Sequence, residues 1–499
     1  MKKILLSTLN ARYIHASLGL RYLKANMGEL GENTSIREYD INMRPIDIAE
    51  SLLAQNPAIL GFGVYIWNVE ETTRVLRLLK QISPEIILVV GGPEVSYEYD
   101  SQEIVTLADY LITGNADLAF HALCEQILSG ESRPAKIIRA GEVHPDRIRF
   151  PYQEYTDQDI ANRIIYVEAS RGCPFKCEFC LSALDKTAQA FPLDSFLDEM
   201  RILYDRGVRH FKFVDRTFNL KVESSMRIME FFLERLDEDL YLHFELIPDH
   251  LPEKLKTVIS RFPEHSLQFE IGIQTLNPRV QELISRKQDH EKMKNNLDWL
   301  HRHSHAHTHA DLIIGLPGED INSFARGFNE LVAMSPDEIQ VGILKRLRGT
   351  PIIRHTVEYD LRFNPSPPYN ILSTRDIDFP TMQRLSRFAR YWDMIINSGR
   401  FPHSKELILA TRPFENFLAL SDWIYQKTGK THAIALERLF RLVFAGMTEA
   451  LALDKENVRA GLLNDFDRTG IRRPVEFLLD DNTSEHAKVK SFRKRQQRH

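Results

Sequence analysis

The chain is organised around the stretch Ala169-Ser-Arg-Gly-Cys-Pro-Phe-Lys-Cys-Glu-Phe-Cys-Leu181. It places Cys173, Cys177 and Cys180 at a C-x3-C-x2-C spacing, between an apolar run and a helical pattern. Three thiolates so close in sequence can bind one iron–sulfur cluster, and a cubane cluster has four irons. One iron would then lack a protein ligand and could bind a small chelating molecule. The alternative is a zinc site with a fourth ligand elsewhere, although zinc motifs favour paired C-x2-C units.

Composition sets the broad class. The 499 residues suggest roughly two to four domains. The formal net charge of −5 argues against bulk nucleic-acid affinity, although the basic tail from Lys488 to His499 could contact RNA or be a solvated end. Three of the four cysteines lie in one motif, which indicates a reducing compartment. With no membrane-length apolar stretch and no cleavage signature, we expect a cytoplasmic protein.

Residues 1–150 alternate between strand-like and helix-like segments, which predicts a doubly wound parallel sheet. The expected strands are Lys3–Thr8, Thr34–Tyr39, Ile59–Val64, Ile86–Val90 and Tyr110–Thr113. Ligands bind beyond the carboxyl ends of the strands in such sheets. Gly91, Gly92 and Gly114 follow the fourth and fifth strands, so they are candidate ligand contacts.

Residues 151–355 alternate in the same way, after an expected linker at Pro151–Asn162. The expected strands are Ile164–Val167, Val208–Val214, Tyr241–Leu246, Leu267–Ile273, His307–Ile314 and Glu338–Leu344. These six strands are fewer than the eight of a full barrel. Glu245, Glu270, Gln274 and Asp311 are unusually polar for a buried sheet. A polar ligand would supply the partners that such side chains need.

Two further regions carry no recognisable catalytic motif. Six histidines fall between His290 and His309; a metal site is one interpretation, and we expect a solvated loop instead. Residues 356–499 have a helical pattern, with helices expected at Thr381–Asn397, Pro413–Lys427 and Ala433–Leu453. A helical cap that closes the barrel is our hypothesis for this region.

The cysteine motif, with Phe179 just before the last Cys, resembles the signature of the radical S-adenosylmethionine (SAM) enzymes. In that family SAM binds the open iron and is reductively cleaved. The stretch from Gly272 to Asp289 resembles the coproporphyrinogen-dehydrogenase and cobalamin branches of the family. The resemblance implies a partial (β/α)6 barrel, a [4Fe-4S] cluster on the three cysteines, and a reductant such as flavodoxin or ferredoxin. The SAM contacts that it implies are Phe179, Glu245, Gln274, Arg286 and Asp311.

Residues 1–150 resemble the cobalamin-binding domain that precedes many radical SAM cores, which has a flavodoxin/Rossmann-like sheet. Gly91, Gly92 and Gly114 would then contact cobalamin. The usual Asp-x-His-x-x-Gly motif is broken here, because the loop reads Arg12-Tyr-Ile-His-Ala-Ser-Leu-Gly19. His15 is therefore either a cobalt ligand or a plain loop histidine. Trp67 either covers the lower corrin face or is a core or interface aromatic.

The resemblance implies an α/β protein of three parts: a cobalamin-binding domain (1–150), a radical SAM core (151–355) and an α-helical domain (356–499). The leading hypothesis is a methyltransferase that cleaves SAM at the cluster and uses cobalamin to methylate an unactivated carbon. A cyclase or rearrangement enzyme with the same cofactors is one alternative, and a non-catalytic binding protein is another. A methylthiotransferase would need three more cysteines, and only Cys124 remains. The residues do not identify the substrate.

Overall fold

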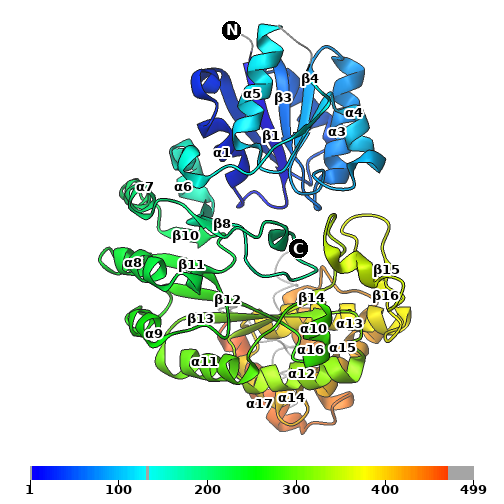
Figure 1. The fold of residues 1–499 in the computed structure, drawn as a ribbon. Helices are drawn as coiled ribbons and strands as arrows, with labels where there is room; N and C mark the ends of the chain where they lie inside the picture. The colour runs from blue at the N-terminus through cyan, green and yellow to red at the C-terminus, as the bar shows by residue number, and fades with distance from the viewer. Residues whose placement is uncertain (1–2, 131–133, 470–499) are drawn as a thin grey trace, which may run out of the picture.

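We describe the protein from a computed structural model, which covers residues 3–130 and 134–469. The basic tail from Lys488 to His499 lies outside these described residues. A first parallel sheet, a second parallel sheet and a set of C-terminal helices follow one another along the chain (Figure 1). Among the described helices, none has the length and apolarity of a membrane span.

The first sheet has six parallel strands in the order β2-β1-β3-β4-β5-β6. The strands are β1 (Lys3–Asn10), β2 (Thr34–Asp40), β3 (Pro57–Gly63), β4 (Ile87–Gly91), β5 (Tyr110–Thr113) and β6 (Ile137–Arg139). This is the flavodoxin-like order, whose topological switch point lies between β1 and β3. The predicted sheet is therefore confirmed, and β6 is an addition to it.

Helices cover both faces of this sheet, which explains why its central strands are apolar throughout. The helices are α1 (Leu18–Ala25), α2 (Pro45–Leu53), α3 (Val69–Ile82), α4 (Glu103–Leu107) and α5 (Ala116–Ser129). One core packs α2, α3 and α4 against the sheet, and a second core packs α1 and α5 against the other face.

The stretch between the two sheets, where a linker is expected at Pro151–Asn162, is folded and packed. Tyr152 and Tyr155 are buried, and α6 (Asp157–Asn162) begins with a capping box between Thr156 and Asp159. Asp159 also forms an ion pair of 2.9 Å with Arg21 of the first domain. The polar residues that suggested a linker are thus partners in packed, paired contacts.

The second sheet also has six parallel strands, in the order β14-β13-β12-β11-β10-β7. They are β7 (Ile165–Val167), β10 (His210–Phe213), β11 (Tyr241–Leu246), β12 (Leu267–Gln274), β13 (His307–Ile314) and β14 (Glu338–Ile343). The helices that alternate with them are α7 (Leu193–Asp205), α8 (Val222–Leu233), α9 (Glu253–Ile259), α10 (Pro278–Leu283), α11 (His290–His303) and α12 (Ile321–Ala333). Sequential order and parallel strands are those of the predicted partial barrel.

The histidine-rich stretch is regular structure, and the prediction of a solvated loop is wrong. Residues His290–His303 form α11, and His307 and His309 lie on β13. Met293, Leu297 and Leu300 of α11 are buried, at a spacing of three and four residues that fits one helical face. The apolar spacing was the informative signal in this stretch.

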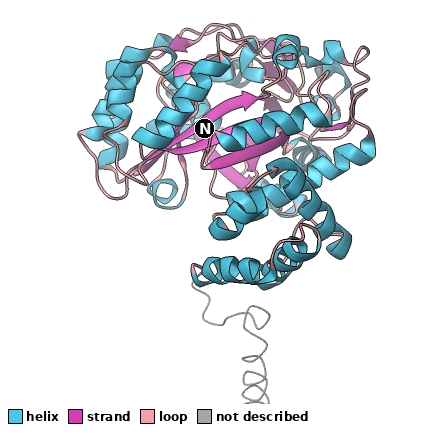
Figure 2. Cartoon of the chain, turned by 90° about the horizontal axis from the view of Figure 1, so that it is seen from below, coloured by secondary structure: helices cyan, strands magenta, loops and turns pink. Residues whose placement is uncertain are grey.

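The C-terminal region contains the predicted helices and two others. Its elements are a hairpin of β15 (Arg362–Phe363) and β16 (Ile371–Ser373), followed by α13 (Phe379–Trp392), α14 (Pro402–Leu409), α15 (Pro413–Thr428), α16 (Leu436–Glu449) and α17 (Lys455–Asp467). Phe328 of α12 packs against Trp392 and Phe414. Figure 2 shows these helices continuing beyond the strands toward the C-terminus.

One side chain shows what this region does for the second sheet. Asn397 donates to the carbonyl of Ile339 at 2.9 Å and accepts from its N–H at 3.2 Å. Ile339 lies on β14, which is an edge strand with otherwise unpaired backbone groups. The helical region thus covers the edge of the barrel. Its preceding loop also contacts the first domain, where Arg348 pairs with Glu94 at 2.8 Å.

Candidate active site

A cavity of about 260 Å³ opens at the carboxyl ends of the strands of the second sheet. Its walls include every residue that the sequence suggested for a cluster and for SAM. These are Cys173, Cys177, Phe179, Cys180, Glu245, Gln274, Arg286 and Asp311. The residues come from the cysteine loop, β11, β12, the segment after α10 and β13, so only the folded barrel brings them together.

Backbone geometry fixes the start of the cysteine loop. Gly172 has a φ of +81°, and a Cβ there would meet Asp185 Oδ1 at 2.8 Å and the Ala188 nitrogen at 2.9 Å. Only glycine fits this position without strain. The N–H of Cys173 donates to the carbonyl of Asp185 at 2.8 Å. Burial, more than the neighbouring thiols, raises the pKa of Cys173.

The alternative to a cluster is a site for a single metal ion. Within residues 3–130 and 134–469, no three His, Cys, Asp or Glu side chains are grouped as a site for one metal ion. A cubane cluster needs only one thiolate for each iron, so its ligands need not converge on one point. The same finding gives no support to a metal site among the described histidines of the 290–309 stretch.

Three buried polar atoms in this cavity lack a hydrogen-bond partner. They are Gln274 Oε1, Arg286 Nε and Asp311 Oδ1. A buried polar atom without a partner costs about 1–3 kcal/mol, so a ligand that pairs with all three would remove a substantial penalty. Burial, together with the charges of Glu270 and Glu245, holds the pKa of Asp311 well above its usual range. A protonated Asp311 can both donate to and accept from a hydroxyl group.

Two further charged groups line this cavity: Arg216, which sequence reasoning missed, and Glu270, which was among the polar strand residues that it identified. Arg216, beyond the end of β10, donates to Glu245 Oε1 at 2.6 Å, so this carboxylate already has a cationic partner. Glu270 accepts from His243 at 2.9 Å and lies 3.7 Å from Lys212. The hydrogen bond from His243 and the charge of Lys212 lower the pKa of Glu270 to about 2. Polar residues alternating with apolar ones on β10, β11 and β12 were the available signal.

Glu178, between Cys177 and Cys180, anchors the cysteine loop and was also missed. Its carboxylate is buried and accepts from Ser285 at 2.7 Å, from His355 at 2.9 Å and from Arg354. A carboxylate inside a cysteine motif could have been singled out, because a buried charge requires partners. The loop is therefore tied to the segment after α10 and to the residues after β14.

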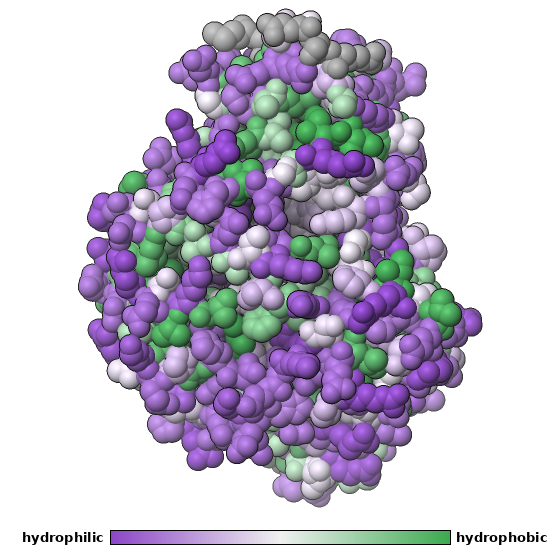
Figure 3. All heavy atoms as spheres, viewed as in Figure 1, coloured by the Kyte–Doolittle hydropathy of each residue, from purple (hydrophilic) through white to green (hydrophobic). Residues whose placement is uncertain are grey.

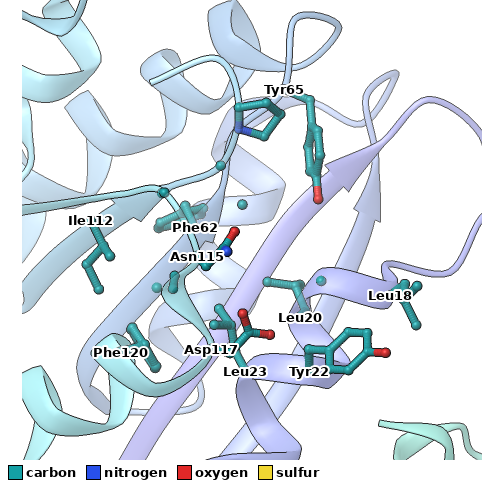
Figure 4. A pocket seen from close by; sticks show the side chains of 18 of the residues that line it. Leu18, Leu20, Tyr22, Leu23, Phe62, Tyr65, Ile112, Asn115, Asp117 and Phe120 are labelled. Atoms are coloured by element: carbon teal, nitrogen blue, oxygen red, sulfur yellow. The ribbon is translucent and has the colours of Figure 1, made fainter. Parts of the chain in front are cut away.

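A second cavity, of about 460 Å³, lies over the carboxyl ends of the first sheet. The predicted Gly91, Gly92 and Gly114 line it, together with Gly61 and Gly63 of β3. Gly92 has a φ of +109°, and a Cβ there would meet the Val64 carbonyl oxygen at 2.6 Å. Figure 4 shows the other walls, with the Tyr65 ring at one end and the Asp117 carboxylate near Tyr22 at the other. Positions without side chains on adjacent strands leave the room for a ligand.

His15 and Trp67 are not among the residues that line this cavity. His15 Nδ1 lies 2.7 Å from the hydroxyl of Tyr166 on β7, and burial with the charges of Lys212 and Arg12 lowers its pKa. Trp67 is 48% exposed and stacks on Tyr65, with the ring centroids 4.5 Å apart. The structure therefore does not bring either side chain into the cavity walls, because each has another partner.

The cysteine loop contributes to both cavities: Glu168, Arg171, Gly172 and Asp185 of the second domain line the cavity of the first, and Cys173 lines the other. Figure 3 shows hydrophobic residues beside a hollow in this part of the surface. A ligand in the first cavity would therefore lie against the segment that carries Cys173.

Three family models match this chain. The B12 binding domain matches residues 4–124, and the Radical SAM superfamily matches residues 167–330. A protein family of unknown function (DUF4080) matches residues 357–499. The first two matches cover the two parallel sheets with their cavities.

Two relatives are similar to more than half of this chain. An uncharacterized methyltransferase of Pyrococcus horikoshii is 25% identical over 296 residues, which are 54% of this chain and 63% of the relative. The cobalamin-dependent radical SAM methyltransferase TokK of Streptomyces tokunonensis is 24% identical over 349 residues, or 63% of this chain and 51% of TokK. The chain thus spans less than two thirds of the length of these relatives.

Solved structures show the same fold. The cobalamin-dependent SAM radical enzyme OxsB, with aqua-cobalamin bound, matches with a TM-score of 0.65 and 12% identity, over 99% of this chain and 84% of OxsB. The radical SAM methyltransferase TsrM from Kitasatospora setae, with cobalamin and a [4Fe-4S] cluster bound, matches with a TM-score of 0.56 and 15% identity, over 70% of this chain and 77% of TsrM.

The chain therefore combines a segment that matches the B12 binding domain with a following segment that matches the Radical SAM superfamily. Cobalamin-dependent radical SAM enzymes have this pair of domains, which implies a [4Fe-4S] cluster, SAM and cobalamin as cofactors. The residues fit these groups: three cysteines and three unpaired polar atoms share one cavity, and glycines line the other. A radical SAM domain also needs a reductant.

Proposed function

We propose that this protein is a cobalamin-dependent radical SAM methyltransferase that methylates an unactivated carbon. The observation that carries the proposal is the cavity in which the cysteine motif meets the unpaired atoms of Gln274, Arg286 and Asp311. When bound, the cluster with SAM supplies one-electron cleavage chemistry, and cobalamin supplies methyl-transfer chemistry. The domain limits near residues 150 and 355 stay predictions.

The side chains of the second domain would bind and orient SAM. Cys173, Cys177 and Cys180 would each bind one iron, which leaves one iron for the ligand. Arg286 Nη1 donates to Cys177 Sγ at 3.2 Å and its Nη2 donates to the carbonyl of Gly272, so Nε is the atom left to bind the carboxylate of SAM. The other contacts are those that the sequence predicts. Gln274 and Asp311 would bind the ribose hydroxyls, Glu245 would bind the amine, and Phe179 would lie beside the adenine.

Glu245 has a constraint that the sequence did not indicate. Because it already accepts from Arg216, binding the amine of SAM would require it to share its carboxylate between two cations. A carboxylate has enough lone pairs for both partners. Arg216 would then hold Glu245 in place and keep it ionised beside the ligand.

The glycine-lined cavity of the first domain would hold cobalamin, with Gly91, Gly92 and Gly114 as backbone contacts. Among the described residues that line this cavity none is a histidine, and His15 Nδ1 lies 2.7 Å from the Tyr166 hydroxyl, so His15 is left out of the proposed cobalamin contacts. Trp67 could contact the ligand only through a change of its stacking on Tyr65.

The proposal can be tested without knowing the substrate. The protein is purified without oxygen, loaded with iron, sulfide and hydroxocobalamin, and reduced in the presence of SAM whose methyl group carries deuterium. We expect S-adenosylhomocysteine in the solution and the labelled methyl group on the recovered cobalamin, detected by mass spectrometry. We also expect 5′-deoxyadenosine, which Cys173→Ala should abolish while the labelled cobalamin remains.

Other outcomes would point elsewhere. 5′-Deoxyadenosine without labelled cobalamin would contradict methyl transfer and favour ring formation or rearrangement. Bound cofactors without either product would favour a non-catalytic binding protein. We further propose that flavodoxin or ferredoxin supplies the electron and that the protein works in the cytoplasm, because the cluster and the free cysteines suit a reducing compartment.

A further inference from the structure

Arg171 stands between the residues of the two cavities in the cysteine loop. It lines the cavity of the first domain, and in the sequence it stands two residues before Cys173. Its Nη1 and Nη2 donate to the two oxygens of Asp117 at 2.9 and 3.1 Å. Asp117 lies in the first turn of α5, so one side chain of the cysteine loop is bound to the wall of the cobalamin cavity.

The guanidinium of Arg171 is held on its other sides as well. Its Nε donates to Glu168 at 2.9 Å, and its Cζ lies 4.3 Å from the centroid of the Tyr22 ring. The side chains of Arg171, Asp117 and Glu168 are only 16%, 8% and 15% exposed. A fork-shaped pair with this little water around it holds one geometry more firmly than a surface ion pair does.

The backbone passes this constraint to the first cysteine. Gly172 and Asp185 both line the same cavity, and a Cβ on Gly172 would collide with the Asp185 carboxylate. The carbonyl of Asp185 accepts from the N–H of Cys173 at 2.8 Å. The cavity wall and the position of Cys173 are therefore parts of one tightly packed segment.

This wall of the cavity contains more carboxylates than cations. Two carboxylates, Asp117 and Glu168, share the single guanidinium of Arg171. Both carboxylates line the cavity, so the wall presents an excess of hydrogen-bond acceptors. The rim of a corrin ring carries amide groups, whose N–H bonds are suitable donors for such acceptors.

We propose that Arg171 is a positioning residue that couples cobalamin binding in the first domain to the geometry of the cysteine loop. This proposal rests on the proposed function, because it requires both cofactors. Binding of the cluster would order Cys173 and with it the wall formed by Arg171 and Gly172. When the wall is already ordered, cobalamin binding loses less conformational entropy. Cobalamin would therefore bind more tightly when the cluster is present.

The experiment measures the dissociation constant of hydroxocobalamin twice, for protein with its reconstituted cluster and for protein from which the cluster has been removed. Coupling between two sites is typically about 5- to 150-fold and acts equally in both directions. We expect the wild-type protein to bind hydroxocobalamin at least about 5-fold more tightly with the cluster than without it. In Arg171→Gln this ratio should fall to about one, and Arg171→Lys should restore part of it.

The control is Arg209→Gln. Arg209 also pairs with a carboxylate, Asp237 at 2.5 Å, and covers the Tyr204 ring at 3.9 Å. It is not among the residues that line either cavity, so its replacement should leave the ratio unchanged. A general loss of packing would raise both dissociation constants and leave their ratio as in the wild type.

If Arg171→Gln does not fold, Asp117→Asn removes the same charge pair with a side chain of equal size. The proposal is overturned if the wild-type ratio is one, or if folded Arg171→Gln or folded Asp117→Asn keeps the wild-type ratio. Failure of the proposed function looks different, because the wild-type protein would then bind no cluster or no hydroxocobalamin at all.

Discussion

Replacing Glu178 by alanine should release the cysteine loop. The carboxylate is 3% exposed and is the shared acceptor of Ser285, Arg354 and His355. Its backbone would keep its own bonds, since its N–H donates to Ile284 and its carbonyl accepts from Ile352. Glu178→Ala therefore removes the side-chain anchor and leaves the main-chain anchor.

The magnitude follows from burial. Breaking a buried ion pair by removing one partner costs about 3–5 kcal/mol. The Arg354 side chain is 61% exposed and can return to water, whereas His355 is 8% exposed and cannot. We therefore expect the free energy of unfolding to fall by about 3 kcal/mol, the lower end of that range.

The assay combines urea denaturation of the cluster-free protein with the iron content per chain after reconstitution and gel filtration. The control is Asp422→Ala, which removes a carboxylate bound to Arg384 at 2.6 Å, with side chains 34% and 42% exposed. This surface pair should contribute less than about 1 kcal/mol and leave the iron content unchanged. If Glu178→Ala unfolded like the control and kept its full iron content, the anchoring role would be refuted.

Three further results are expected. Burial raises the pKa of Glu319, which accepts a hydrogen bond from Thr275, from 4.5 to about 7. The folded protein therefore binds this proton more tightly than the unfolded chain does. The free energy of unfolding should fall by about 3 kcal/mol as the pH rises from 4.5 to 7. Urea denaturation at several pH values checks this, since Glu319→Gln should lack that fall. Gly92→Ala should weaken hydroxocobalamin binding at least about tenfold, because its Cβ would meet the Val64 carbonyl oxygen at 2.6 Å; equal dissociation constants would contradict this. Cys124 is fully buried, with its pKa raised by burial to about 12, so iodoacetamide should label it only after unfolding, as mass spectrometry can show.

Much of the fold could be predicted because its strands are apolar runs between helical patterns. The pattern was not enough where two signals competed. At His290–His303 the histidines suggested a polar loop, while the buried Met293 and Leu297 set the helical face. At Pro151–Asn162 polar residues suggested a linker, although Asp159 is the partner of Arg21, far away in the sequence.

The candidate site was predictable in part for a related reason. Local motifs identify Cys173 and its neighbours, because loop ligands lie close together in the sequence. Glu178 and Arg171 are important only through partners that lie far away in the sequence, such as His355 and Asp117. No single stretch of sequence contains these pairs, so only the folded chain reveals them.

The most direct test of the central claim is the production of 5′-deoxyadenosine from SAM by the reconstituted, reduced protein, measured by liquid chromatography with mass spectrometry. The variant Cys180→Ala is measured beside the wild type, with the Asp422→Ala protein as a folded control. We predict 5′-deoxyadenosine from the wild type and the control, and none from Cys180→Ala. A wild-type protein with a full cluster that forms none, or a Cys180→Ala protein that forms as much as the wild type, would contradict the account.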